Sequence, residues 1–276
     1  VLGDSAAAGL GCDDRHETPG ALLASQLADA SGRDVVLSVV AESGAESPWL
    51  AAQVERALAV RPDVAIIIIG GNDITHRIPR AVSTAALGAA VTALRDVGAL
   101  VVVGTCPDLG TIRPLMEPLR SYARIASRRL ASAQTVATVE AGGVAVSLGH
   151  ILGPEFEAMP EHLFSADRFH PSPWGYSRVV ACLLPSVMSG LGIAAVAETS
   201  VVARGTSTEL VPLWRAAWLA NDVPGTEVSP DLEATVERAG RPHLPRRSAA
   251  VAAVTRRLRR PSAPPVPNSH EVVTPI

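Results

Sequence analysis

The sequence contains no lysine, since all 24 of its basic residues are arginines. Enzymes that depend on a lysine nucleophile, a Schiff base or a P-loop lysine are therefore excluded. The three cysteines, Cys12, Cys106 and Cys182, are too few for a disulfide framework, and no CxxC or HExxH motif occurs. Nine aromatic residues among 276 argue against an extended stacking groove for a polysaccharide. The apolar run at 64–69 is far shorter than the ~20 residues of a membrane-spanning helix.

Charge is unevenly distributed along the chain. The net charge of −3 conceals an acidic body, residues 1–240, with 17 arginines against 26 acidic residues. Residues 241–260, in contrast, hold seven arginines and no acidic residue. An acidic body argues against a nucleic-acid-binding core. Because 47% of the residues are hydrophobic and only 18% are charged, the chain can bury a large core.

Short apolar runs bounded by turn residues predict the strands of a sheet. These runs are residues 35–40, 64–69, 100–103 and, less clearly, 135–139, and Val1-Leu2 resembles the end of a further strand. Such runs are typical of parallel strands covered on both faces. The segments between them have helical periodicity. The alternation predicts an α/β fold, a three-layer α/β/α sandwich around a mostly parallel five-stranded sheet.

Helix starts in the intervening segments support this prediction. Thr18-Pro19, Ser47-Pro48 and Ser172-Pro173 each place a capping residue before a proline at the first helical position. Residues 79–97 and 114–131 are predicted to form two longer helices. On the second of these, arginines recur every fourth residue, and we expect them to form a solvated face; they are Arg120, Arg124 and Arg128.

Three segments differ in composition. Residues 1–193 carry the strand–helix rhythm and are predicted to be the catalytic domain. Residues 194–240 mix short helical stretches with turns and are expected to form a partly helical extension. Residues 241–276 are rich in arginine, proline and alanine, so we expect a poorly ordered tail that adds nothing to the sheet or the site.

Polar residues follow the first three predicted strands. Ser5 follows the first, Gly44 the second and Asn72 the third. Ligands bind outside the carboxyl ends of the strands in open α/β sheets, so these residues meet if the first strand lies between the other two. A hydroxyl, a glycine amide and a carboxamide are the groups that acyl transfer needs. The acids in the same loops, Asp4 and Asp73, are interpreted as braces of the loops.

A general base is predicted near the end of the strand–helix region. Among seven histidines we select His170, which sits in Asp167-Arg168-Phe169-His170, after the last predicted strand and directly before a capped helix. Asp167 can then bond Nδ1 of His170 and leave Nε2 free to act on Ser5.

These four sequence blocks resemble those of the SGNH/GDSL hydrolases, of the mycobacterial or actinobacterial type, over roughly residues 1–190. The blocks are Gly3-Asp4-Ser5, Gly44, Gly70-x-Asn72-Asp73 and Asp167-x-x-His170. The resemblance implies a flavodoxin-like sheet and a serine esterase or lipase that needs no metal or cofactor. It also implies roles for the residues: Ser5 as nucleophile, His170 as base and Asp167 as its orienting partner. The oxyanion hole would consist of the Ser5 amide, the Gly44 amide and the Asn72 side chain.

Two other functions remain open from the sequence. An acyltransferase that moves an acyl group to a sugar or lipid hydroxyl would use the same site. A non-catalytic, flavodoxin-like binding module is the third possibility, although the chain lacks GxGxxG and P-loop spacing.

The expected partner is a small-molecule or lipid ester, not a nucleic acid. The basic segment 241–260 could contact an anionic membrane surface weakly if it formed an amphipathic helix. Only Val1 and Leu2 precede Gly3, so we expect upstream residues to be missing and leave localisation open. The family resemblance implies export or a place in the cell envelope.

Overall fold

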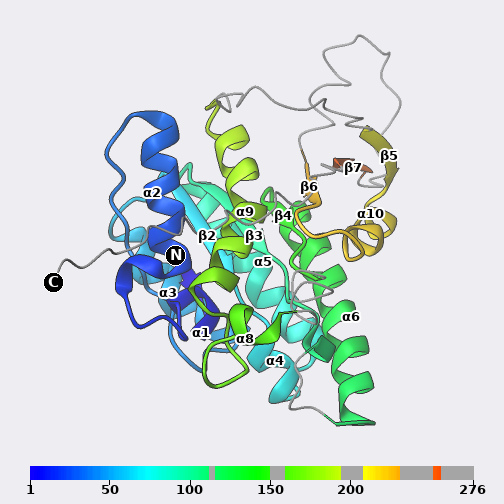
Figure 1. Ribbon diagram of the computed structural model, residues 1–276. Coiled ribbons are helices and arrows are strands. Elements are labelled where there is room, and N and C mark those ends of the chain that lie inside the picture. The colour runs from blue at the N-terminus through cyan, green and yellow to red at the C-terminus, as the bar shows by residue number, and fades with distance from the viewer. Residues whose placement is uncertain (112–115, 150–158, 194–207, 231–250, 256–276) are drawn as a thin grey trace, which may run out of the picture.

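The protein, seen here in a computed structural model, is built around one seven-stranded sheet (Figure 1). The structure describes residues 1–111, 116–149, 159–193, 208–230 and 251–255. The strands lie in the order β1-β2-β3-β4-β6-β7-β5. Their bounds are β1 Leu2–Gly3, β2 Val64–Ile68, β3 Leu100–Gly104, β4 Val144–Val146, β5 Thr208–Pro212, β6 Glu227–Ser229 and β7 Val251–Thr255.

The first four strands are parallel, and helices cover both of their faces. One face packs Ile66, Ile68 and Val102 against α2 (Pro19–Ser31) and α9 (Pro173–Gly190). The other face packs Ile67 and Val103 against helices that include α3 (Leu50–Leu58) and α5 (Arg80–Asp96). The remaining helices are α1 Ser5–Ala8, α4 Gly71–Thr75, α6 Leu119–Glu140, α8 Pro160–Leu163 and α10 Leu213–Ala220, with 3₁₀ turns η1 Arg15–Glu17, η2 Ser47–Trp49 and η3 Leu109–Thr111. The predicted three-layer, mostly parallel α/β fold is therefore confirmed.

Residues 35–40 take the fifth parallel position without being a regular strand. The nitrogen of Val1 donates a hydrogen bond to Ser38 O, and the backbone N–H of Val40 donates to Val1 O at 2.9 Å. One bond of this ladder is missing, because the Gly3 N–H donates to the side chain of Gln53 at 2.7 Å, and the ladder resumes where the Glu42 N–H donates to Gly3 O at 3.1 Å. β1 thus lies between this segment and β2, as the site prediction required.

The strand predicted at 135–139 is wrong, because these residues lie within α6. Thr135, Thr138 and Val139 are buried there, and packing of their side chains outweighs their preference for strands. The fourth parallel strand is β4 instead, which begins after Gly142 and Gly143 and is only three residues long.

The C-terminal region extends the sheet, contrary to the expectation that residues 241–276 contribute nothing to it. β6 pairs antiparallel with β4, and β7, at 251–255, pairs antiparallel with both β6 and β5. Backbone pairing suffices for this, so the composition of the tail was a poor guide to it. The rest of the tail lies outside the described residues, and the predicted domain boundaries stay predictions.

At Gly3, the backbones of β1 and β2 are too close together to leave room for a side chain. Its φ is +134°, and a Cβ placed on it would lie 1.8 Å from the carbonyl oxygen of Ile68. Only glycine can occupy this position, because any side chain would collide with the neighbouring strand's backbone. The next residue, Asp4, donates its N–H to Ile68 O at 3.1 Å, which fixes where the chain leaves the sheet.

Gly3→Ala should therefore destabilise the protein by on the order of 3 kcal/mol, since the added methyl forces β1 and β2 apart. Urea unfolding monitored by circular dichroism measures this loss. The matched control is Gly32→Ala, at a left-handed position with φ +64° where a Cβ meets nothing within 4 Å. This control should lose only about 1 kcal/mol from backbone strain. Equal losses in the two variants would contradict the argument.

Candidate active site

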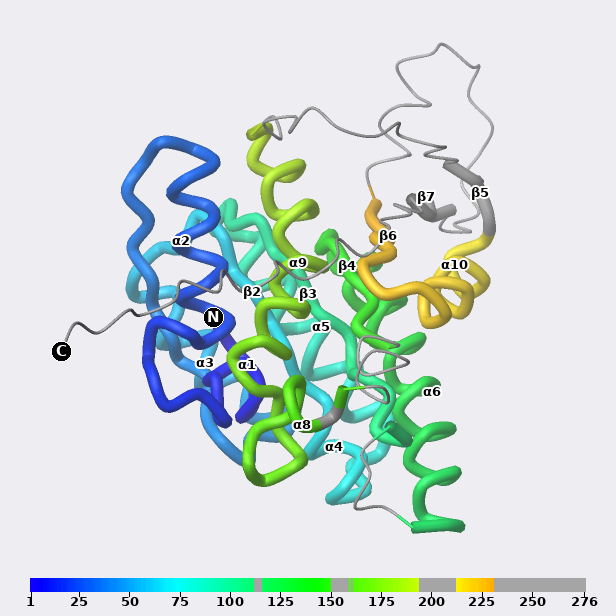
Figure 2. Tube along the Cα trace, in the orientation of Figure 1, coloured from blue at the N-terminus to red at the C-terminus, as the bar shows by residue number. Residues whose placement is uncertain are grey.

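Ser5, His170 and Asp167 are joined by hydrogen bonds in the structure. Nε2 of His170 lies 2.9 Å from Oγ of Ser5, and Nδ1 lies 2.6 Å from Oδ2 of Asp167. Ser5 opens α1 directly after β1, whereas Asp167 and His170 lie in the loop before α9. The tube in Figure 2 shows how α1 and the chain around α8 and α9 approach each other from distant parts of the sequence. The three residues predicted from the sequence are thus brought together.

Asp167 is held as a carboxylate by the loop that carries it. Its Oδ1 accepts hydrogen bonds from Ser165 Oγ and from the backbone N–H groups of Phe169 and His170, at 2.7 to 2.9 Å. Partial burial by itself raises the pKa of Asp167, but these bonds and the His170 ring together lower it well below its usual range. An ionised Asp167 fixes the orientation of the His170 ring.

Asp4 braces the turn that presents Ser5. It caps α1 by accepting the N–H of Ala6 at 3.0 Å, and its carboxylate also faces the N–H groups of Gly70 and Gly71. Burial raises the pKa of Asp4 to about 6 despite these bonds, and the nearby charge of Asp73 adds to the increase. The expected bracing role is confirmed, because Asp4 links the nucleophile turn to the loop after β2.

Asn72 is tied to the loop that contains Gly44. Asn72, in α4, donates one Nδ2 hydrogen to Ala45 O at 2.9 Å, which leaves its second hydrogen available. Gly44 has a φ of +82° and is exposed, and within the described residues its N–H makes no hydrogen bond. Ser5 and Asn72 both line the pocket described below, whereas Gly44 is not among the residues that line it.

Buried polar side chains fix the loops around the site. Asp73 accepts hydrogen bonds from the Ser47 N–H and Oγ and from Ser83 Oγ, at 2.6 to 3.2 Å, so its predicted bracing role is confirmed. Sequence reasoning missed Gln53, whose side chain bonds both N–H and C=O of Gly3. A glutamine on the otherwise apolar face of a helix could have pointed to it, because a buried polar side chain needs hydrogen-bond partners. Ser47, expected to cap a helix, instead bonds Asp73.

The Ser5 hydroxyl opens into a small apolar pocket of about 80 Å³. Its walls include Ile68, Pro107, Leu109, Leu148 and Phe169. This volume is well below the roughly 300 Å³ at the lower end of pockets for drug-sized ligands, so the space suits a short apolar group.

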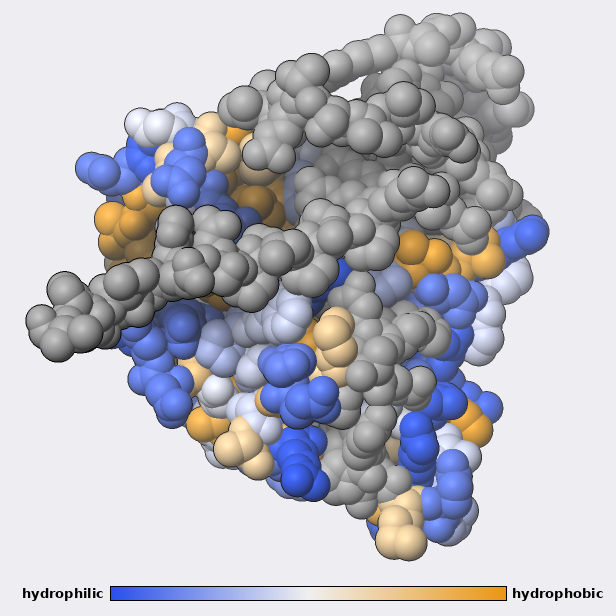
Figure 3. Space-filling model, in the orientation of Figure 1, coloured by the Kyte–Doolittle hydropathy of each residue, from blue (hydrophilic) through white to orange (hydrophobic). Residues whose placement is uncertain are grey.

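A larger hollow of about 460 Å³ lies between α5, α6 and α10. Arg80, Arg129, Trp214 and Trp218 line it, and Figure 3 shows hydrophobic residues at the surface where α10 lies. It contains no histidine beside a serine. The hydrogen-bonded pair of Ser5 and His170 lines the smaller pocket instead.

Cys106 is the other potential nucleophile near the site. Burial, together with the charges of Asp4, Asp73 and Asp108, raises the pKa of its thiol well above the ordinary value. A thiol in this state is a poor nucleophile, because the thiolate is the reactive form. Among the described residues, no group of three or more histidine, cysteine or acidic side chains is placed to hold a metal ion.

A serine, a histidine and a carboxylate in one hydrogen-bonded chain, at the carboxyl edge of a parallel sheet, are typical of α/β serine hydrolases. Residues 1–178 match the GDSL-like lipase/acylhydrolase family. The chain therefore belongs to this family and is an SGNH/GDSL hydrolase. Membership supports carboxylester hydrolase activity and sets aside the non-catalytic binding module.

Similar proteins agree with this assignment. The GDSL-like esterase Rv1075c of Mycobacterium tuberculosis (strain ATCC 25618 / H37Rv) is 46% identical over 193 residues. The alignment covers 69% of this chain and 62% of that protein, so the chain spans less than two thirds of the relative's length.

Solved structures share the fold at lower identity. The lipase Lip_vut3 from a goat rumen metagenome has a TM-score of 0.54 and 17% identity, covering 70% of this chain and 96% of its own. The psychrotrophic esterase EstA from Pseudoalteromonas sp. has a TM-score of 0.53 and 19% identity, covering 69% and 96%. Likeness at this level of identity establishes the fold alone. In the part of the chain that the structure describes, none of the helices has the length and apolar character to cross a membrane.

The raised pKa of Asp4 makes stability depend on pH. Stability that requires protonated Asp4 is fully present below the ordinary pKa of 3.8 and is lost as the pH rises through about 6. Asp4→Asn keeps the acceptor for Ala6 but cannot ionise. The variant should therefore gain stability relative to the wild type between pH 4 and pH 7, as measured by urea unfolding.

The control for this comparison is Asp34→Asn, at an exposed position. Its stability relative to the wild type should stay constant over the same pH range. A constant difference for Asp4→Asn as well would mean that Asp4 is not desolvated in the folded protein.

Proposed function

We propose that the protein hydrolyses carboxylic esters through an acyl-enzyme on Ser5. The observation that carries the proposal is the chain of hydrogen bonds from Asp167 through His170 to Ser5, which ends at an apolar pocket. Oγ of Ser5 attacks the ester carbonyl while Nε2 of His170 takes the hydroxyl proton. The carbonyl C=O becomes a tetrahedral oxyanion.

Three hydrogen-bond donors receive this oxyanion in the proposed mechanism. They are the N–H of Ser5 at the start of α1, the N–H of Gly44 and the second Nδ2 hydrogen of Asn72. Two observations support this choice of donors. One donor comes from each of the three loops at this edge of the sheet, and the Asn72–Ala45 hydrogen bond joins two of these loops. Preorganised donors of this kind stabilise the transition state without rearrangement.

Collapse of the tetrahedral intermediate completes the first half of the reaction. The bond to the alcohol oxygen breaks, and His170 returns its proton to the departing alcohol. Water, deprotonated by His170, then attacks the acyl group on Ser5, and release of the acid regenerates the serine. Asp167 stays ionised and stabilises the imidazolium form of His170 in both halves.

The acyl group in this proposal is short and apolar, because the pocket beside Ser5 is small and lined mainly by hydrocarbon. Transfer of the same acyl group to a sugar or lipid hydroxyl remains the alternative. Product analysis with added alcohols separates the two, since a transferase diverts the acyl group from water to the alcohol.

Ser5→Ala tests the nucleophile. Hydrolysis of p-nitrophenyl acetate should fall by about 10³-fold or more, because no other hydroxyl takes the place of Oγ. Labelling of the wild type by an organophosphonate should map to Ser5 by mass spectrometry. Circular dichroism must show an unchanged fold. Retained hydrolysis, or a label on another residue, would move the reaction away from Ser5.

Asn72→Ala tests the oxyanion hole. Loss of one donor should lower kcat by about 10²–10³-fold with little change in KM, because the donor acts on the transition state. The matched control is His76→Ala, which removes the 2.7 Å contact between His76, directly after α4, and Glu46 but no donor to the pocket. The control should keep kcat within a few-fold. A similar fall in both variants would mean that Asn72 acts only by tethering the loop.

A further inference from the structure

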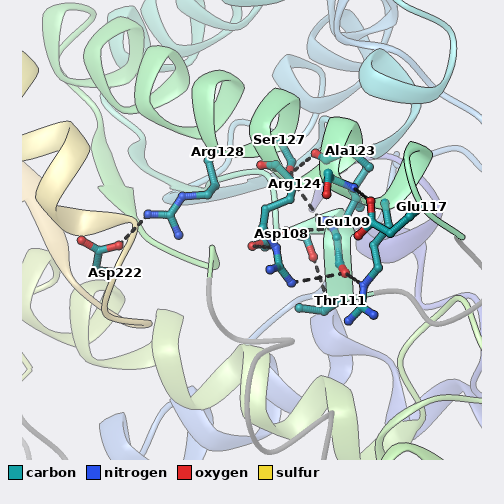
Figure 4. Close-up of polar contacts among 12 residues, drawn as sticks. Asp108, Leu109, Thr111, Glu117, Ala123, Arg124, Ser127, Arg128 and Asp222 are labelled. Atoms are coloured by element: carbon teal, nitrogen blue, oxygen red, sulfur yellow. Dashed lines mark hydrogen bonds and ion pairs between the residues drawn. The ribbon is translucent and has the colours of Figure 1, made fainter.

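The three arginines of α6 are only partly solvated, with 47% of the Arg124 side chain and 22% of the Arg128 side chain exposed, and each contacts a neighbouring segment. The Nε of Arg120 donates to Gly110 O at 2.8 Å, and Arg124 lies 3.5 Å from both Gly110 O and the carboxylate of Asp108. Arg128 pairs with Asp222 at 2.6 Å. Figure 4 shows Arg124 pointing at the Asp108 turn and Arg128 pointing away from it, toward Asp222.

Three apolar or aromatic side chains of the same helix are exposed as well. Leu119, Tyr122 and Ile125 are each about half exposed. The buried face of α6 includes Ala123, Ser127 and Leu130, whereas the Arg124 side chain is 47% exposed. Arg120 and Arg124 nevertheless contact the turn after β3 through their guanidinium groups.

The turn that these arginines bind is η3, together with Asp108 before it. Asp108 is 2% exposed and accepts the N–H of Gly110 at 2.8 Å, while Thr111 Oγ1 donates to Asp108 O at 2.7 Å. Leu109 N–H donates to Ser127 Oγ of α6 at 3.3 Å. A Cβ on Gly110 would lie 2.5 Å from Cβ of Arg124, so the turn lies directly against the helix.

The same turn forms one wall of the pocket beside Ser5. Leu109 and Pro107 line that pocket, and Leu109 also packs on Ala123 of α6. The arginines therefore contact the side of the turn that faces α6, and the Leu109 side chain on the same turn limits the size of the pocket.

We propose that Arg120 and Arg124 are positioning residues for acyl-chain specificity, because they hold the Leu109 wall against the pocket. This inference rests on the proposed ester hydrolysis and deepens it. The two guanidiniums contact neither Ser5 nor the reacting carbonyl, so they act through the 108–111 turn. Without them the turn can move away from the pocket, and longer acyl groups can enter.

The test compares p-nitrophenyl octanoate with p-nitrophenyl acetate in Arg120→Met, Arg124→Met and the double variant. Methionine keeps an aliphatic stem and removes the N–H donors. The ratio of kcat/KM for octanoate to that for acetate should rise about 10-fold in the double variant, which is within the range that a change in pocket size produces. Because both esters are measured on one preparation, partial loss of folded protein cancels from the ratio.

Arg129→Met is the matched control, since Arg129 is on the same helix but lines the hollow beside α10. Its ratio should equal that of the wild type. Leu109→Ala removes the wall side chain directly and should raise the ratio in the same direction as the double variant.

Two results would overturn the proposal. An unchanged ratio in Leu109→Ala would show that Leu109 does not limit the acyl group, and this variant decides the matter even if the arginine variants fail to fold. A raised ratio in Leu109→Ala with an unchanged ratio in the folded double variant would show that the wall stands without the arginines. A wild type that hydrolyses neither ester would refute the proposed function itself, and the inference with it.

Discussion

The approach of β1 to β2 at Gly3 is the constraint on which the rest of the site depends. The backbone at Gly3 comes so close to Ile68 that no side chain fits, and the N–H of the next residue, Asp4, donates to Ile68 O. Ser5 follows immediately at the start of α1, so its position relative to the loop after β2 is set by strand pairing. A side chain placed by the backbone of a sheet is held more precisely than one on a free loop.

Hydrogen bonds of buried polar side chains fix the neighbouring loops relative to the sheet. Gln53 bonds both the N–H and the C=O of Gly3. Gln134 of α6 links the ends of β2 and β3 in the same way, because it donates to Ile69 O and accepts the N–H of Cys106. Asp73 ties the Gly44 loop to α4 and α5. Each of these groups would be costly to bury without its partners, so the network favours one arrangement of the loops over all others.

The long helix α6 joins the catalytic edge of the sheet to the C-terminal extension. Its arginines bind the turn behind the pocket at one end and Asp222 further along. Near the same place, Asn221 donates to Arg128 O and Ser132 Oγ. One rigid element thus contacts the wall of the pocket and the segment before β6. Changes in the extension therefore have a physical route to the pocket, through the position of α6.

Local patterns in the sequence were enough to predict much of this protein. The apolar runs at 64–69 and 100–103 became β2 and β3, and Thr18 and Ser172 cap α2 and α9 as expected. The order of the loops placed Ser5, Asn72 and His170 at one edge of the sheet. These features follow from periodicity, capping and the rule for parallel sheets, all of which act over a few residues.

Only the tertiary structure decided where long-range packing overrides such local preferences. Residues 135–139 have the composition of a strand, yet they complete a helix because their side chains are buried against the sheet. The arginines of α6 have the spacing of a solvated face, yet they also bind the carbonyl of Gly110 and the carboxylates of Asp108 and Asp222. Gln53 bonds Gly3 across 50 residues of sequence. The sequence by itself determined the class of fold and which serine, histidine and carboxylate to expect together, whereas the partners of the buried polar groups depended on which surfaces the folded chain brought into contact.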